Sequence, residues 1–199
     1  MYYDPQIRGL RRTVDADTEP VTTAEAKTHL RIDHTDDDTY IGSLITAARN
    51  IAENYTNRAF YTQTWVQTMS YFPREILELK RGYVQSVSSL KYYNDANSQV
   101  TWASSNYTVN TSGDIGYIDA DNDFPTDLYD RSDAIEITYV SGWSQIADIP
   151  QAIKQAILLI VGHLYENRQD VIVGSQVNQL PLASQYLLNP YTIHHVYGL

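Results

Sequence analysis

Apolar residues recur at steps of three and four positions in three parts of the chain, and this spacing predicts three amphipathic helices. The first covers about residues 22–32 and the second about 36–57. The third covers about 150–169. The first helix has a clear start, because Thr22 is followed three positions later by Glu25, which is the pattern of a capping box.

The other two helices also carry start signals. Thr35 or Asp36 is expected to cap the second helix. Pro150 stands in the first turn of the third, where its missing N–H costs no hydrogen bond. Leu158 and Leu159 widen the apolar surface of this third helix beyond one stripe. We therefore expect it to be buried on more than one side, in a core or between subunits.

The stretch from about 62 to 143 has the alternation and the β-forming residues that are typical of strands. Residues 94–97 read Asn-Asp-Ala-Asn, which is good hairpin chemistry because Asn and Asp tolerate left-handed backbone. The expected strands are 62–72, 75–79, 84–93, 100–102, 107–110, 116–118 and 135–140. This order predicts an α+β fold, in which two N-terminal helices and a long C-terminal helix form a helical bundle core with a β-rich insertion between them.

The two ends of the chain differ from this central part. Residues 1–20 are polar and charged, without periodicity, and are expected to form an N-terminal arm. An α+β domain is expected over 21–175. A C-terminal tail follows over 176–199, in which 182–188 is expected to form a short helix ahead of Pro190.

The composition excludes several classes of protein. The 199 residues include no cysteine, which rules out a disulfide scaffold, a zinc finger, an iron–sulfur protein and a cysteine nucleophile. The longest apolar run, 156–161, is far shorter than the ~20 residues that cross a bilayer. The first 20 residues also lack the apolar run of a signal peptide. We therefore expect a soluble protein without a membrane partner.

Charge and tyrosine content bear on the expected partners. The chain has 14 Lys and Arg against 24 Asp and Glu, a formal net charge of −10, which argues against a protein whose main task is to grip nucleic acid. Only Arg8, Arg11 and Arg12 form a cluster of cations. The 17 tyrosines stand beside three phenylalanines. This excess fits burial against a partner protein, and it also fits the ordinary preference of tyrosine for strands.

One acidic stretch resembles part of a metal site. Asp119, Asp121 and Asp123 match the start of a calcium loop, with Asp130 at the twelfth position. The sixth position of such a loop is Gly, and here it is Phe124. A solvated acidic turn is the simpler interpretation of these residues.

Other candidate chemistry is weaker. The acidic residues 36–38 point in different directions on a helix, and they suit its N-terminus. The five histidines show no H-E-x-x-H spacing, and the chain has neither a G-x-S-x-G elbow nor a glycine-rich phosphate loop. We therefore predict that the protein is not an enzyme and uses no cofactor or metal.

A calcium- or carbohydrate-binding β module, carried on helices, is the alternative function. It depends on Trp65, Trp102 and Trp143 together with the acidic stretch at 119–123. Aromatic residues in strands are commonly core residues, which weakens this hypothesis. A calcium-dependent rise in melting temperature would favour it.

Three segments together resemble the phage head–tail connector family, also called adaptor or head-completion proteins. The first, 21–33, reads VTTAEAKTHLRID, the second, 52–65, reads AENYTNRAFYTQTW, and the third, 149–168, reads IPQAIKQAILLIVGHLYENR. Each motif is only moderately specific, but their order and spacing strengthen the match, which spans about 21–190. The N-terminal arm and the β-rich insertion depart from the pattern.

The resemblance implies a structural virion protein that forms a ring, usually of twelve copies, beneath the portal at the capsid vertex. Such a ring joins the portal to a tail or stopper protein at the head–tail interface. It leaves a channel through which DNA passes without specific binding. The ring would be assembled in the host cytoplasm.

The resemblance also implies contact residues. The C-terminal segment of such proteins docks on the portal, and the residues expected to do so here are Leu182, Tyr186, Leu187, Leu188 and Tyr191. A closed ring needs two different patches on each copy. The residues expected at the subunit interface are Tyr40, Leu44, Leu158, Leu159 and Tyr165.

Overall fold

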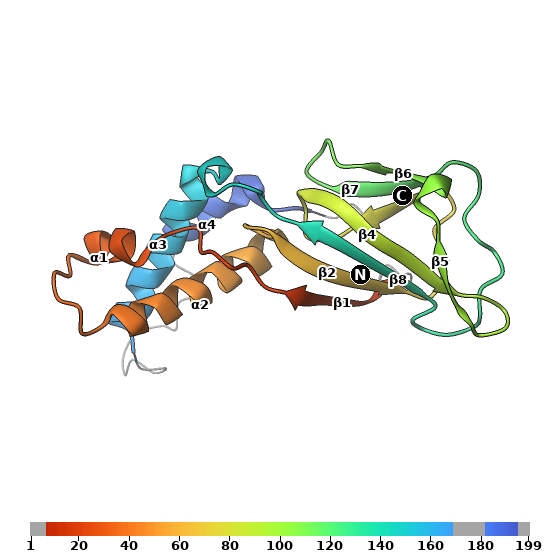
Figure 1. The fold of residues 1–199 in the computed structure, drawn as a ribbon. Helices are drawn as coiled ribbons and strands as arrows, with labels where there is room; N and C mark the ends of the chain where they lie inside the picture. Colours follow the sequence, from red (N-terminus) through yellow and green to blue (C-terminus); the bar gives the residue numbers. More distant parts are fainter. Residues whose placement is uncertain (1–6, 169–181, 195–199) are drawn as a thin grey trace. The chain divides into compact units, whose positions relative to one another are not determined.

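The computed structural model describes residues 7–168 and 182–194, which fold into two compact units. One unit holds the helices and the other holds the sheets (Figure 1). The predicted α+β class, with strands inserted between helices, is confirmed. The helical unit is Asp17–Phe60 with Gln145–Thr192, and the β unit is Met1–Ala16, Tyr61–Ser144 and Ile193–Leu199.

The predicted helices are all present, with ends a few residues shorter than expected. None of the helices in the described ranges is long and apolar enough to cross a bilayer. The α-helices are α1 (Thr23–Leu30), α2 (Asp38–Thr56), α3 (Gln151–Glu166) and α4 (Leu182–Leu188), and 3-10 turns lie at Ser104–Asn106, Ile146–Asp148 and Asn189–Tyr191.

Helix α1 begins with the predicted capping box. The Thr22 hydroxyl accepts the backbone N–H of Glu25 at 3.1 Å, and the Glu25 carboxylate accepts the backbone N–H of Thr22 at 2.7 Å. The backbone N–H and the hydroxyl of Thr22 both donate to the Glu25 carboxylate, which lowers the pKa of Glu25. The helix ends at Arg31, which adopts the left-handed conformation at φ 58°.

The expected cap of α2 was wrong. Asp37 precedes the helix, rather than Thr35 or Asp36, and its side chain makes no capping hydrogen bond. The physical reason is that the Asp37 carboxylate is engaged by Tyr165 and Arg168 at the end of α3. Tertiary contacts across the unit therefore override the local capping preference.

Helices α2 and α3 pack along one another and form the core of the helical unit. Their buried apolar residues recur at the predicted three- and four-residue steps. The core residues are Ile41, Leu44, Ile45, Ala48 and Ala52 on α2, and Ile153, Ala156, Ile157, Ile160 and Val161 on α3.

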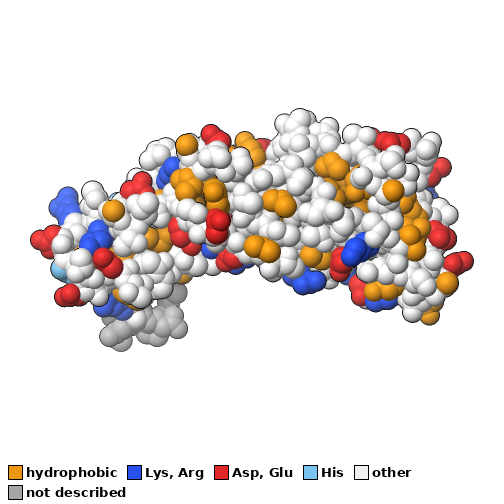
Figure 2. All heavy atoms as spheres, viewed as in Figure 1, with side chains coloured by type: hydrophobic (Ala, Val, Ile, Leu, Met, Phe, Trp, Pro, Cys, Tyr) orange, Lys and Arg blue, Asp and Glu red, His pale blue; other side chains and the backbone are white. Residues whose placement is uncertain are grey.

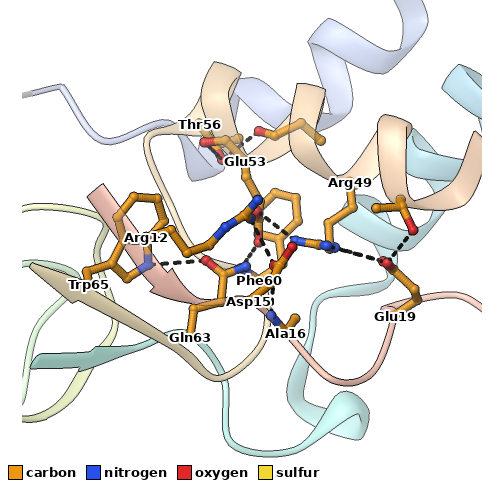
Figure 3. Close-up of polar contacts among 12 residues, drawn as sticks. Arg12, Asp15, Ala16, Glu19, Arg49, Glu53, Thr56, Phe60, Gln63 and Trp65 are labelled. Carbon is orange, nitrogen blue, oxygen red and sulfur yellow. Dashed lines mark hydrogen bonds and ion pairs between the residues drawn. The ribbon is translucent and has the colours of Figure 1, made fainter. Parts of the chain in front are cut away.

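A buried arginine lies within this unit (Figure 3). Arg49 is 1% exposed, and its Nε lies 2.8 Å from the Glu19 carboxylate. Its Nη1 lies 3.1 Å from the carboxylate of Glu53, which also accepts the backbone N–H of Phe60 at 2.8 Å. Arg49 thus ties helix α2 to the segment that precedes α1.

The β unit holds two antiparallel sheets. Strands β2, β8 and β4 form the middle of a five-stranded sheet of order β1-β2-β8-β4-β5, and the three-stranded sheet has the order β3-β7-β6. All predicted strands are present. The strands are β1 (Ile7–Val14), β2 (Gln63–Met69), β3 (Ile76–Leu79), β4 (Val84–Tyr93), β5 (Gln99–Trp102), β6 (Tyr107–Asn110), β7 (Gly116–Ala120) and β8 (Ile135–Ser141).

Strand β1 lies within residues 1–20, which were expected to form an N-terminal arm and for which no strand was predicted. It pairs antiparallel with β2 from Ile7 to Val14. Its register shifts twice, between Ile7 and Gly9 and again between Arg12 and Val14. Such bulges break the period of two on which strand prediction depends, so the sequence pattern hides this strand.

One turn of the β unit requires a glycine, because the backbone there is tightly packed. Gly142 has φ +108°, and a Cβ there would lie 2.1 Å from the Tyr61 carbonyl oxygen. Only glycine fits this position. The predicted hairpin at 94–97 is also confirmed, because Asn97 adopts φ 55° and its N–H donates to the Asn94 carbonyl at 2.7 Å.

Candidate assembly surfaces

Two of the tyrosines expected at a subunit interface lie together in the helical unit. Tyr40 on α2 and Tyr165 on α3 have ring centroids 6.1 Å apart. The Arg168 guanidinium lies 4.8 Å from the centroid of each ring, and it also pairs with Asp37 at 3.4 Å. We call Asp37, Tyr40, Tyr165 and Arg168 the tyrosine clasp. It holds the end of α3 against the start of α2.

The tyrosine clasp has perturbed acid–base behaviour. The Tyr165 hydroxyl donates a hydrogen bond to Asp37, which lowers the pKa of the Asp37 carboxyl, and the Arg168 charge lowers it further. The same hydrogen bond raises the pKa of Tyr165. Because the pKa of Asp37 is depressed in the folded state, the ionised carboxylate stabilises the fold above its ordinary value of 3.8. That stabilisation is lost as the pH falls through the folded pKa.

We therefore predict a pH-dependent effect of Asp37→Asn. At pH 7 the variant should melt at a lower temperature than the wild type, because the amide replaces a carboxylate that Tyr165 and Arg168 engage. The gap should narrow below pH 3.8 and close as the pH falls through the lowered pKa of the folded carboxyl, where the wild-type side chain becomes protonated. Thermal melts across this range measure it, with Asp36→Asn as an exposed control. A gap that is constant with pH would contradict the assignment.

The remaining predicted interface residues differ in exposure. Leu158 and Leu159 on α3 are half-buried, so each still offers apolar surface to a partner. Leu44 is 9% exposed and packs in the core of the helical unit. Its side chain therefore serves that core, and it offers little surface for contact between copies.

The residues predicted to dock on the portal, on and just after helix α4, also differ in exposure. Leu182 is 70% exposed and Tyr186 is 73% exposed, although both are large apolar side chains. Leu187 and Tyr191 are half-buried, whereas Leu188 is fully buried in the helical unit. Leu188 therefore anchors the helix, and its opposite face presents Leu182 and Tyr186. The part of the predicted tail before Leu182, 176–181, lies outside the described residues.

The 3-10 turn that directly follows α4 makes polar contacts with Tyr55 on α2 and with Arg58 just beyond it. The Tyr55 hydroxyl donates to the Asn189 side chain at 2.6 Å. The Arg58 side chain donates to the Tyr191 carbonyl. These contacts, with the packing of α4 on α3, fix the position of the helix that carries the exposed Leu182 and Tyr186.

The β unit carries a groove that no sequence pattern predicted. It has a volume of about 850 Å³ and lies where three separate segments meet, 71–74, 92–102 and 123–128. No local motif signals such a groove, because its residues come together only in the fold. Its aromatic lining consists of Tyr71, Phe72, Tyr92, Trp102 and Phe124.

The acidic stretch does not form a metal site of the expected kind. Within the described ranges, no group of three or more His, Cys, Asp and Glu side chains is arranged to hold a metal ion. Asp123 lines the groove instead, and Asp121 accepts a hydrogen bond from the Thr108 hydroxyl at 3.1 Å. Trp65 is 7% exposed and Trp143 is 6% exposed, so neither offers a ring face to a sugar. The Trp65 indole instead donates to the Gln63 side chain at 3.1 Å (Figure 3).

The chain matches a known protein family. A family model described as "Head completion protein" matches residues 20–179. No curated protein sequence matches the chain. A head completion role is structural, so this match supports the prediction that the protein is not an enzyme.

Solved structures with a similar fold come from gene transfer agent (GTA) particles. A chain from the neck of an empty GTA particle, computed with C6 symmetry, has a TM-score of 0.78 at 19% identity, covering 96% of this chain and 99% of that chain. A chain from the virion of a native GTA particle has a TM-score of 0.75 at 19% identity, with the same coverage of both chains. A chain from the neck of a native GTA particle, computed with C12 symmetry, has a TM-score of 0.74 at 18% identity, again with the same coverage. At these identities, the likeness shows a shared fold.

Proposed function

Because this chain belongs to the head completion protein family, we propose that it forms a ring in the neck of a phage-like particle, between the portal and the tail. The observation that carries the proposal is a fold shared over almost the whole chain with chains from particle necks. Those necks were computed with C6 and C12 symmetry. A ring of twelve copies is compatible with both, because twelvefold symmetry contains sixfold symmetry.

The helical unit supplies surfaces that suit contacts between copies. Aromatic and arginine side chains are favoured at protein interfaces, and the tyrosine clasp presents both. Leu158 and Leu159 add half-buried apolar surface on α3. We assign these residues to the contacts between neighbouring copies.

Helix α4 supplies the surface that contacts the portal. Leu182 and Tyr186 are one helical turn apart and form an apolar pair on its exposed face. A tail or stopper protein would occupy the other side of the ring. The virion neck is thus the proposed location, and the host cytoplasm the place of assembly.

The charge of the chain suits an open bore. Each copy carries a net charge of −10, so the wall of the ring has little affinity for phosphates. DNA could then slide through without being held. Salt screens such charges over ~8 Å at physiological ionic strength, so copies of like net charge can still assemble.

Particles made with and without this protein test the proposal. We expect electron cryomicroscopy of the complete particles to show an annulus of this protein at the neck, with an open centre and twelve copies. Particles that lack the protein should have heads without attached tails. A complete neck in particles that lack the protein, or a single copy at the neck, would contradict the proposal.

A further inference from the structure

Strand β1 presents positive charge at the edge of the five-stranded sheet. Residues 7–14 contain three arginines and no acidic residue, although the whole chain is acidic. Arg12 pairs with Asp15 at 3.0 Å, and Arg8 donates to the Ser70 hydroxyl at 3.2 Å. Arg11 is exposed and makes no ion pair with any residue that the structure describes. It is a cation without a local counter-charge.

The segment 119–133 presents the opposite charge. It contains six aspartates and one arginine, and that arginine, Arg131, pairs with Asp133 at 2.6 Å. The other five aspartates make no ion pair within the described part of the chain. Figure 2 shows acidic side chains along the rim of the β unit beyond β5 and β6. The unpaired aspartates are Asp119, Asp121, Asp123, Asp127 and Asp130.

In the groove, acidic side chains lie next to aromatic side chains. Asp123 and Asp127 line the groove beside its aromatic side chains, and Arg74 is the cation among the lining residues. A carboxylate next to an aromatic face is an environment that favours a guanidinium group, through an ion pair and a cation–π contact. We call this set of residues the acidic groove.

Arg131 makes such a contact within the β unit. The Arg131 guanidinium lies 3.8 Å from the centroid of the Tyr93 ring, and two of its nitrogens donate to Asp133 at 2.6 and 2.8 Å. An arginine held between a tyrosine face and a carboxylate is therefore stable in this part of the fold. The acidic groove offers the same pairing of carboxylates with aromatic faces, in Asp123 and Asp127 beside its aromatic lining.

The basic strand and the acidic segment occupy different places on the β unit. Segment 119–133 is attached at the end of β4, where Leu128 bridges Asn94 and the N–H of Tyr129 donates to the Tyr93 carbonyl at 3.0 Å. Strands β2 and β8 lie between β1 and β4. Three strand spacings, about 14 Å, therefore separate the basic strand β1 from β4, at whose end the acidic segment is attached. One copy thus has two different, complementary patches, as a head-to-tail ring requires.

We propose that the arginine edge of β1 in one copy contacts the acidic groove of the next copy, with Arg11 as the central cation. This inference rests on the proposed ring and names one of its subunit contacts. The partner is a second copy of this chain, because the chain itself carries both complementary charges. Such a contact would fix the direction of assembly around the ring.

Charge reversal tests the contact in particles that lack the wild-type protein. Arg11→Glu alone, or Asp123→Lys with Asp127→Lys, places like charges together, and we expect each to reduce the number of rings about tenfold or more. A 1:1 mixture of the two proteins should restore rings, because alternating copies then place opposite charges at every contact. Arg31→Glu, an exposed arginine of the helical unit, is the control with the same change in charge.

The outcomes separate this inference from the proposed function. If the wild-type protein and both variants all formed rings, the proposed contact would be overturned and the proposed ring would stand. Folded variants that fail to assemble even in the mixture would also overturn direct pairing. Absence of a ring for the wild-type protein would instead contradict the proposed function. Circular dichroism melts establish that each variant is folded.

Discussion

Replacing Arg49 with methionine should lower the free energy of unfolding by about 3–5 kcal/mol, because it removes one partner of the buried ion pair between Arg49 and Glu53. The Glu53 side chain is 4% exposed, and its carboxylate also accepts the Phe60 N–H. Glu19 is 28% exposed and can turn to water. A loss of this size is a large share of the 5–15 kcal/mol that typically stabilises a domain.

Urea unfolding followed by circular dichroism measures this loss. Arg31→Met removes an exposed arginine from the same unit and should change stability little. The double variant Arg49→Met with Glu53→Gln should recover part of the loss, because the glutamine amide oxygen can still accept the Phe60 N–H without a buried charge. If Arg49→Met were as stable as the wild type, the ion pairs would contribute nothing to the fold.

Arg49 also shows what the sequence could not predict. Arginine is normally a surface residue, and nothing in the spacing around Arg49 distinguishes it from its exposed counterparts. Its two carboxylate partners lie 30 positions before it and four positions after it. Only the four-residue pair has a local signature, so burial of the network depends on tertiary packing.

Where a pattern is regular, the sequence predicted the structure well. The bounds predicted for β4, 84–93, are those of the structure, and the three-four periodicity located α2 and α3 within a few residues. Strand β1 was missed because its two bulges break the alternation. Regular elements can be predicted from the period of their apolar residues. An irregular strand such as β1 is defined by its pairing with a partner strand, which the sequence pattern does not show.

The candidate surfaces were likewise predictable only in part from the sequence. Tyr40 and Tyr165 were predicted to lie at the contact between copies, which stays a prediction. Within one copy their rings lie together, and the position of Arg168 against both rings had no sequence signal. The acidic groove joins segments that are up to about fifty positions apart. Predicting it would require knowing which loops converge, and that information lies in the sheet order rather than in any single motif.

The second large effect is expected on helix α4. Replacing both Leu182 and Tyr186 with aspartate should abolish attachment to the portal while leaving the fold intact. Both side chains are at least 70% exposed in the free protein, so their apolar surface is available for burial against a partner. Full burial of one such side chain contributes about 1.5–3 kcal/mol. Loss of both therefore weakens binding about 10²- to 10⁴-fold, and burial of two carboxylates would weaken it further.

Point substitutions test this surface better than deletion of the segment. Leu188 and Ser184 are fully buried, so removal of α4 would open the core of the helical unit as well. Gln151→Asp with Gln155→Asp is the matched control, because it adds two charges one turn apart at exposed positions of α3. Sedimentation of each variant with tailless heads measures attachment, and thermal melts report on the fold. Undiminished attachment of the α4 variant would place the portal contact elsewhere, because two charges on a buried apolar contact cannot be silent.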